Sequence, residues 1–302
     1  MRIAVTGREG QVLRSLIERA PLFGHELVAL GRPGLDLAGN REAIIEGLAS
    51  VAPHAIVSAA AYTAVDRAES EPEMAYAINQ QGAEAVAAAA SRLDVPLVHL
   101  STDYVFDGFK GEPYLEVDPT GPTGVYGASK LAGEQAVLAA CANTAILRTA
   151  WVYSPFGANF VKTMLRLASE RDEVSVVADQ CGNPTSALDI AEGVLQVAAN
   201  LAASPRAEQR GVFHMTAAGE ASWADFAEAI FLSSQKVNGP SARVRRIATS
   251  EYPTPARRPA NSRLDSSKLE RVHGVRLPNW RASLDEVVRR LVTEPTHAKV
   301  AS

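Results

Sequence analysis

Tyr126 and Lys130 are the two residues whose types and spacing point most directly to chemistry. They bound the segment Tyr126-Gly-Ala-Ser-Lys130, and a spacing of four places both side chains on one helical face, one turn apart. A free tyrosine titrates near about 10 and shuttles protons poorly at neutral pH. A nearby lysine ammonium stabilises the phenolate and lowers that pKa. The pair therefore predicts a proton donor to a developing alkoxide, with the lysine also holding the ribose hydroxyls of a nicotinamide cofactor.

Thr102 offers a third polar group, at the end of an apolar run. It belongs to the segment Leu100-Ser-Thr-Asp-Tyr-Val-Phe106. A hydroxyl just beyond the carboxyl end of a central strand lies where ligands bind in open parallel sheets. We therefore expect Thr102 to hydrogen-bond a substrate carbonyl and its developing oxyanion. The alternative interpretation is a Thr-Asp turn that only caps the strand.

A glycine-containing turn near the N-terminus predicts a diphosphate site. Gly7 and Gly10 stand between an apolar run and a helical pattern in the segment Val5-Thr-Gly-Arg-Glu-Gly-Gln-Val-Leu13. Glycines at these positions let backbone N–H groups approach a diphosphate at the helix N-terminus. A third glycine is expected at position 13, where Leu13 stands instead. The fingerprint is incomplete, and a glycine-rich turn without a ligand is the alternative.

Arg32 follows the second predicted strand, at the position that distinguishes NAD from NADP. An NAD-selective site usually carries a carboxylate there for the ribose hydroxyls. The segment Leu30-Gly-Arg-Pro33 has none, and Arg32 could pair with a 2′-phosphate. This favours NADPH and permits NADH. A solvated surface arginine is the alternative, and Asp36, the next acidic residue, could approach the adenine side.

Small residues follow the third predicted strand. The segment Ala59-Ala-Ala-Tyr62 comes directly after it. Small side chains such as that of Ala60 let a cofactor lie flat against the backbone. Ordinary packing of a helix on a strand would explain the same residues.

The first half of the chain predicts the elements that position these residues. Short apolar runs alternate with longer segments of helical spacing, which predicts a parallel sheet covered by helices on both faces. The predicted strands are residues 2–5, 26–30, 55–58, 95–101 and 144–148, and the predicted helices are 9–20, 41–51, 72–93 and 125–141. Right-handed crossovers then give a doubly wound α/β Rossmann fold.

The second half is less regular and predicts a smaller C-terminal substrate-binding domain. Helices are predicted for residues 159–170, 187–200, 222–233 and 283–291, and strands for 174–178 and 211–215. The proline-rich segment 252–259 cannot form a regular helix. We expect an NAD(P)-binding domain over 1–153 and a second domain over 154–302, with residues of about 186–216 returning to pack on the Rossmann sheet.

Composition and charge exclude several classes of function. The 302 residues are 47% hydrophobic and 21% charged, which is typical of a globular protein. The formal net charge of −4 argues against nucleic acid as a main partner, because phosphate binding requires a basic surface. Neither Cys141 and Cys181 nor the six histidines show a metal-ligand spacing. A Gly-x-Ser-x-Gly segment is lacking, which counts against a serine hydrolase.

The sequence shows neither a secretory pattern nor an apolar stretch long enough to span a bilayer. We therefore expect a cytoplasmic protein without a membrane partner.

With these residues assembled, the chain resembles the dTDP-4-dehydrorhamnose reductase family of extended short-chain dehydrogenases. The likeness runs from residue 2 to about 291. Segments shared widely with related epimerases and dehydratases are 7–12, 59–72, 101–108, 126–134 and 148–153. Segments 159–165, 179–185 and 252–262, above all Pro253-Thr-Pro-Ala-Arg-Arg-Pro259, are more particular to this family.

The resemblance implies a reaction and a set of site residues. The reaction is reduction of the C4 ketone of dTDP-4-dehydro-L-rhamnose to dTDP-L-rhamnose, with NADPH and often NADH as cofactor. The implied catalytic set is Thr102, Tyr126 and Lys130. The implied substrate-binding residues are Thr102, Asp103, Tyr104, Tyr126 and Trp151, in a chain whose second domain binds the sugar nucleotide. The motifs above already give Gly7, Gly10, Arg32, Ala60, Tyr126 and Lys130 as candidates for cofactor binding. The resemblance adds the cofactor-binding residues Gln11, Val12, Asp36, Leu37, Ala61, Tyr62 and Thr63.

The chain also departs from the family pattern. Leu13 replaces a glycine, and Tyr62 stands where members often carry histidine. Some members form dimers bridged by Mg²⁺ through glutamates, and the matching positions here are Ser15, Leu188 and Arg290. Because none of these is a carboxylate, we expect no structural metal and a monomer or weak homodimer.

Two other functions remain open from the sequence. One is a non-catalytic NAD(P)-binding regulatory subunit, like the β subunit of methionine adenosyltransferase. The other is a different sugar-nucleotide epimerase or dehydratase. The intact set of Thr102, Tyr126 and Lys130 argues for an enzyme. A dehydratase would need more acidic groups beside Thr102 than Asp103 alone.

Overall fold

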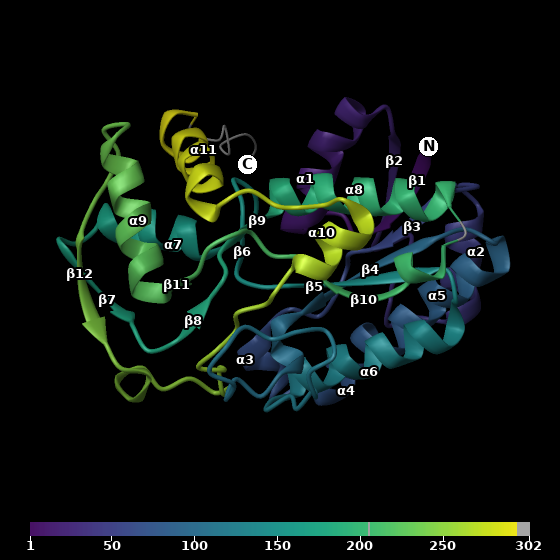
Figure 1. Cartoon of the computed structure of the whole chain (residues 1–302), viewed down its shortest axis with the longest axis horizontal. Coiled ribbons are helices and arrows are strands. Elements are labelled where there is room, and N and C mark those ends of the chain that lie inside the picture. Colours follow the sequence, from purple (N-terminus) through teal and green to yellow (C-terminus); the bar gives the residue numbers. More distant parts are fainter. Residues whose placement is uncertain (205, 295–302) are drawn as a thin grey trace.

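A six-stranded parallel sheet forms the centre of the molecule (Figure 1). The computed structural model describes residues 1–204 and 206–294. The strand order is β10-β5-β4-β3-β1-β2, and every neighbouring pair is parallel. The strands are β1 Arg2–Thr6, β2 Glu26–Leu30, β3 Ala55–Ser58, β4 Leu97–Thr102, β5 Thr144–Thr149 and β10 Gly211–His214. The predicted doubly wound fold is confirmed.

Helices cover both faces of this sheet, as its uniformly apolar strands require. Alternate residues of β1 point to opposite faces: Ile3 and Val5 pack with one cluster and Ala4 with the other. On the first face lie α1 Gln11–Arg19 and α8 Ala187–Ala203. On the second face lie α2 Arg41–Ala49, α5 Ala83–Leu93 and α6 Val125–Ala140.

A smaller lobe gathers beside the carboxyl ends of the strands, on the left of Figure 1. Three two-stranded pairings hold this lobe, namely β6 Val152–Tyr153 with β9 Thr185–Ser186, β7 Glu173–Val177 with β12 Arg243–Ile247, and β8 Cys181–Gly182 with β11 Ala221–Ser222. Its helices are α7 Phe160–Ala168, α9 Trp223–Gln235 and α11 Trp280–Thr293. The domain boundary at residue 153 stays a prediction, while β10 pairs with β5 in the central sheet.

Some elements differ from the sequence-based expectation. The predicted helix 72–93 is divided into α4 Pro72–Tyr76, a π-helical turn Ala77–Gly82 and α5. The carbonyl of Asn79 in that turn lies so close to Gly133 of α6 that a side chain at position 133 would overlap it. Close approach of the two helices therefore depends on this glycine.

The elements that were not predicted include α3 Val65–Ala68, β12 and α10 Ser267–His273. β12 reads Arg-Val-Arg-Arg-Ile and is mostly exposed, so it lacks the apolar pattern of a buried strand. It forms because it pairs in register with β7 over five residues. Helix α11 begins three residues before the predicted start at 283, because the side chain of Asn279 accepts a hydrogen bond from the N–H of Arg281.

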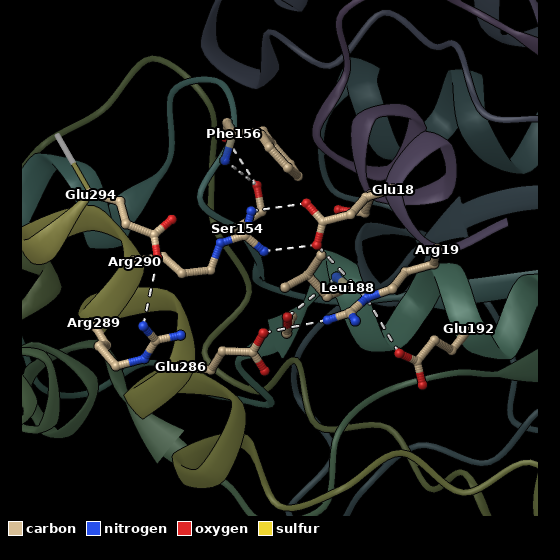
Figure 2. Close-up of polar contacts among 12 residues, drawn as sticks. Glu18, Arg19, Ser154, Phe156, Leu188, Glu192, Glu286, Arg289, Arg290 and Glu294 are labelled. Atoms are coloured by element: carbon tan, nitrogen blue, oxygen red, sulfur yellow. Dashed lines mark hydrogen bonds and ion pairs between the residues drawn. The ribbon is translucent and has the colours of Figure 1, made fainter. Parts of the chain in front are cut away.

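Ion pairs fasten α1 to α11 and to α8 (Figure 2). The two terminal nitrogens of Arg290 each donate to one oxygen of Glu18, both at 2.8 Å. Arg19, next to Glu18 on α1, pairs with Glu192 of α8 and Glu286 of α11, both at 3.4 Å. The last helix thus returns to the first, which fixes the smaller lobe against the sheet helices.

No helix in residues 1–204 and 206–294 is long and apolar enough to cross a membrane.

Candidate active site

A cavity of about 550 Å³ opens at the carboxyl ends of β1, β3, β4 and β5. In an open parallel sheet this edge is the usual ligand site. A second hollow of about 560 Å³ adjoins it beside β2, and the two share Gly7, Glu9, Ala60 and Ala61 in their walls. Because they share these walls, the two hollows form one groove along this edge of the sheet.

The structure brings nearly all the predicted site residues to this groove. The first cavity is lined by the candidates Gly7, Gly10, Gln11, Val12, Ala60, Ala61, Thr63, Thr102, Asp103, Tyr104, Tyr126, Lys130 and Trp151. Arg32, Asp36 and Leu37 line the second hollow. Tyr62 lines neither, because its hydroxyl turns away and donates to Glu71 at 2.7 Å. Its role toward a cofactor is the least supported of the set.

Helix α6 carries Tyr126 and Lys130 into the cavity from its first turns. Lys130 is 3% exposed, and its Nζ donates to the carbonyl of Leu100 at 2.7 Å and lies 3.5 Å from Nε2 of His99. Burial lowers the pKa of Lys130 to about 8, although the charge of Glu134 opposes this effect. The Lys130 ammonium is therefore held against strand β4.

Tyr126 differs from the sequence-based expectation. Removal from water raises the pKa of its hydroxyl to about 12, while interaction with Thr102 lowers it and the charge of Asp103 raises it. The ammonium of Lys130 is turned toward Leu100 and His99 and does not lower the pKa of Tyr126. Tyr126 therefore stays protonated at neutral pH, as a proton donor must.

Thr102 caps the turn after β4 and also lines the cavity, while its contact with a substrate stays a prediction. It ends β4 and caps the following 3-10 turn Asp103–Val105, since its Oγ1 accepts from the N–H of Tyr104 at 3.3 Å. The same hydroxyl donates to Asp103 Oδ1 at 3.0 Å and lines the cavity. Burial raises the pKa of Asp103 to about 6, although hydrogen bonds from Ser262 and Thr102 lower it. The turn thus places a hydroxyl and a carboxyl side by side facing Tyr126.

Trp151 closes the cavity on the side of the smaller lobe. Its backbone is in the left-handed region with φ of 48°, which is rare for a large side chain. Its ring stacks on Trp223, with centroids 3.5 Å apart and planes 7° from parallel. The sequence predicted only a helix from residue 222, and Ser222 caps α9. The role of Trp223 as the support of Trp151 carried no signal in the sequence.

The glycine turn is built as a dinucleotide cofactor would require. Gly7 has φ of 117°, and its N–H donates to the carbonyl of Leu30 at 2.6 Å. Gly10 caps α1 through its backbone only, with no acidic residue in the first helical turn. The N–H groups at this helix end therefore face the cavity, and the macrodipole favours an anion there. The residues of this turn therefore fit a nicotinamide dinucleotide.

Leu13, which stands in place of a third glycine, does not obstruct this turn. It is 2% exposed and packs into the core between α1 and the sheet. Its side chain also reaches the wall of the cavity, so a core side chain stands here in place of the third glycine.

The positions of the family's metal bridge hold other groups (Figure 2). Ser15 is buried and donates to the carbonyl of Gln11 at 2.9 Å, and Leu188 is 2% exposed. Arg290 pairs with Glu18 at 2.8 Å. None of the three is a carboxylate and Arg290 is itself a cation, so these residues do not fit a hard cation. Across residues 1–204 and 206–294 no group of three or more potential ligands gathers, and the lack of a metal stays a prediction.

Other residues of the cavity wall were missed. Ser101, Thr149, Gly157 and Ala158 line it without having been predicted. Thr149 ends β5 just as Thr102 ends β4, so strand-end reasoning applied to the fifth strand could have found it. Gly157 and Ala158 lie in a loop of the smaller lobe and offered no signal.

The proline-rich segment, residues 252–259, lies next to this site. With Asp107, Phe109 and Asp179 it walls a hollow of about 480 Å³. Arg258 pairs with Asp66 at 2.8 Å, and Arg257 lies 5.1 Å over the Phe109 ring. The segment thus contributes cationic groups to the face that the smaller lobe turns toward the sheet.

Comparison with known proteins agrees with the resemblance seen in the sequence. The sequence model of the family described as RmlD substrate binding domain matches residues 1–293. The dTDP-4-dehydrorhamnose reductase of Sinorhizobium fredii is 53% identical over 294 residues, which cover 97% of this chain and 99% of that protein.

Solved structures give the same result. A dTDP-4-dehydrorhamnose reductase from Clostridium acetobutylicum matches with a TM-score of 0.89 and 38% identity, covering 96% of this chain and 99% of that one. The dTDP-4-dehydrorhamnose reductase of Bacillus anthracis, solved in complex with NADP, matches with a TM-score of 0.87 and 36% identity over 95% and 98% of the two chains. The chain therefore belongs to the dTDP-4-dehydrorhamnose reductase family, and it is an oxidoreductase.

Proposed function

We propose that the protein reduces the C4 ketone of dTDP-4-dehydro-L-rhamnose to dTDP-L-rhamnose with NADPH, and that Tyr126 gives the proton. The observation that carries the proposal is the meeting of Thr102, Tyr126 and Lys130 in one cavity, between the glycine turn and Trp151. Membership of the reductase family and the NADP complex of the Bacillus anthracis protein support it.

Each of these residues has one task in the proposed reaction. A bound nicotinamide supplies hydride to C4 of the sugar. Tyr126 transfers its phenolic proton to the C4 oxygen as the carbonyl becomes an alcohol. Thr102 donates a hydrogen bond to the same oxygen and stabilises the charge that develops on it. The Lys130 ammonium, which donates to the carbonyl of Leu100, holds the ribose hydroxyls of the cofactor.

The sugar itself meets the opposite wall of the cavity. Trp151 offers an apolar ring face, while Asp103 and Tyr104 provide polar groups next to Thr102. Burial raises the pKa of the Tyr104 hydroxyl above its ordinary value, so this group remains a hydrogen-bond donor. A flat ring and a few fixed polar groups are the usual means of orienting a small polar ligand.

The function is tested by following NADPH oxidation with dTDP-4-dehydrorhamnose, in parallel with UDP- and GDP-linked 4-keto sugars. We expect turnover with the dTDP-linked sugar and much slower turnover with the others. Tight NADPH binding without turnover of any of them would contradict the proposal and favour a regulatory subunit.

Replacement of Tyr126 by Phe tests the proton donor. Tyr126→Phe removes only the hydroxyl, so we expect kcat to fall by about 10²–10⁴-fold while the dissociation constant for NADPH stays nearly normal. Steady-state kinetics and NADPH fluorescence titration measure the two quantities. Turnover at the wild-type level would show that another group gives the proton.

Replacement of Lys130 by Met tests the ribose contact. Lys130→Met removes a charged donor, so we expect NADPH affinity to fall about 10-fold or more and kcat to fall as well. In the wild type, NADPH affinity should decline as pH rises through about 8, because the ammonium loses its proton there. The matched control is Lys268→Met, since Lys268 Nζ also donates to a backbone carbonyl, that of Val212, at 2.7 Å but outside the cavity. A loss of rate with unchanged NADPH affinity would refute the ribose contact.

Replacement of Arg32 by Ala tests the choice of cofactor. Arg32 lines the hollow beside β2, so Arg32→Ala should weaken NADPH binding about 10-fold through loss of the contact to the 2′-phosphate. NADH binding should change little, as should binding of both cofactors to Arg41→Ala, whose arginine pairs with Glu42 at the protein surface. Equal weakening of NADPH and NADH would mean that Arg32 does not read the phosphate.

A further inference from the structure

Glu134 is a buried carboxylate that lies one helical turn beyond Lys130 on α6. It is 2% exposed and accepts three hydrogen bonds. Ser101 Oγ donates to its Oε1 at 2.5 Å, and Arg148 donates from Nε at 2.9 Å and from a terminal nitrogen at 2.6 Å. Neither the proposed reaction nor the sequence motifs give this group a task.

The contacts of Glu134 continue a series that joins β4 to α6 residue by residue. His99 and the carbonyl of Leu100 contact Lys130. Ser101 donates to Glu134. The next residue, Thr102, interacts with Tyr126. The last residues of β4 are therefore held against the face of α6 that carries the proposed catalytic groups. Among these contacts, that of Ser101 is the one next to Thr102.

The ion pair of Glu134 and Arg148 costs more free energy than an apolar pair would need to fill the same buried space. Moving two charges out of water costs several kcal/mol per ion, and an apolar pair of similar volume often serves stability equally well. Arg148 is not fully satisfied, since one terminal nitrogen lacks a partner among the described residues and its guanidinium lies 5.0 Å over the Phe106 ring. The position of the pair, between the strand end and the helix of the site, indicates a purpose other than stability.

We propose that Glu134 is a positioning residue for the reduction: through Ser101 it fixes the strand end that carries Thr102, and its negative charge holds the Lys130 ammonium in the buried site. The inference rests on the proposed function for its catalytic part, but its effect on Lys130 can be measured without turnover.

The charged and titratable groups around Lys130 determine the direction of the effect. On β4 lies His99, whose pKa burial holds well below its ordinary value, so it is neutral and accepts from Lys130. On α6 lie Glu134 and Tyr126, and Arg148 on β5 and Asp103 lie beyond them. The charge of Glu134 raises the pKa of Lys130 against the effect of burial. Its removal should therefore lower that pKa further, so that the ammonium loses its proton at a lower pH.

Glu134→Gln tests this directly. We expect the pH at which NADPH affinity declines to move down by about half a unit or more, because Lys130 loses its anionic neighbour. We also expect kcat to fall about 10- to 100-fold, because Thr102 is no longer held in place. Fluorescence titration of NADPH across the pH range gives the first quantity, and steady-state kinetics gives the second.

Asp189→Asn is the matched control for a merely structural loss. Asp189 is also a largely buried carboxylate that accepts a short hydrogen bond from a serine, Ser283 at 2.6 Å, but it joins α8 to α11 away from the cavity. This variant should be less stable, with kcat and the pH dependence of NADPH binding unchanged. The proposal is overturned if Glu134→Gln keeps the wild-type pH dependence and loses no more kcat than Asp189→Asn.

Ser101→Ala separates the two roles and keeps the proposal testable if Glu134→Gln does not fold. It removes the link to Thr102 and leaves the Glu134–Arg148 pair intact. We expect kcat to fall about 10-fold while the pH dependence of NADPH binding stays as in the wild type. Wild-type kcat in Ser101→Ala would overturn the link to Thr102. A wild-type protein that binds NADPH with the expected pH dependence and turns over no sugar would instead refute the proposed function.

Discussion

The hydrogen bonds between the end of β4 and the buried face of α6 are the constraint on which the site depends. Lys130 donates to the carbonyl of Leu100 at 2.7 Å, in the interior of the protein, where an unpaired ammonium would be costly. This contact sets the helix against the strand, and Tyr126 lies one turn earlier on the same face. Once the helix is fixed there, its tyrosine must face the strand end that carries Thr102.

Parallel strand topology gives this arrangement its context. The carboxyl ends of β1, β3, β4 and β5 meet at one edge, so the glycine turn, the small residues after β3 and the hydroxyl after β4 all face one groove. The smaller lobe closes that groove with Trp151, which is held by its stack on Trp223. The ion pairs of Glu18 and Arg19 hold the last helix to the sheet helices and keep the lobe in place (Figure 2).

Much of this was predictable from the sequence, because it follows from local pattern. The strand over residues 55–58 has the predicted bounds, and the glycines, Tyr126, Lys130 and Thr102 line the groove as expected. What failed depends on contacts between distant segments. β12 is a strand only because β7 pairs with it. Trp223 supports Trp151 although more than seventy residues separate the two in the sequence. The pKa of Tyr126 also follows from burial, which spacing alone does not reveal.

The central claim is that Tyr126 serves the C4 oxygen of a nucleotide-linked sugar while Lys130 holds the cofactor. A crystal structure of the protein with NADP⁺ and dTDP-L-rhamnose measures this most directly. The account predicts the C4 hydroxyl within about 2.6–3.2 Å of Tyr126 Oη and a ribose hydroxyl at the same distance from Lys130 Nζ. A sugar whose C4 hydroxyl points away from Tyr126, with another acidic group at that distance, would contradict it.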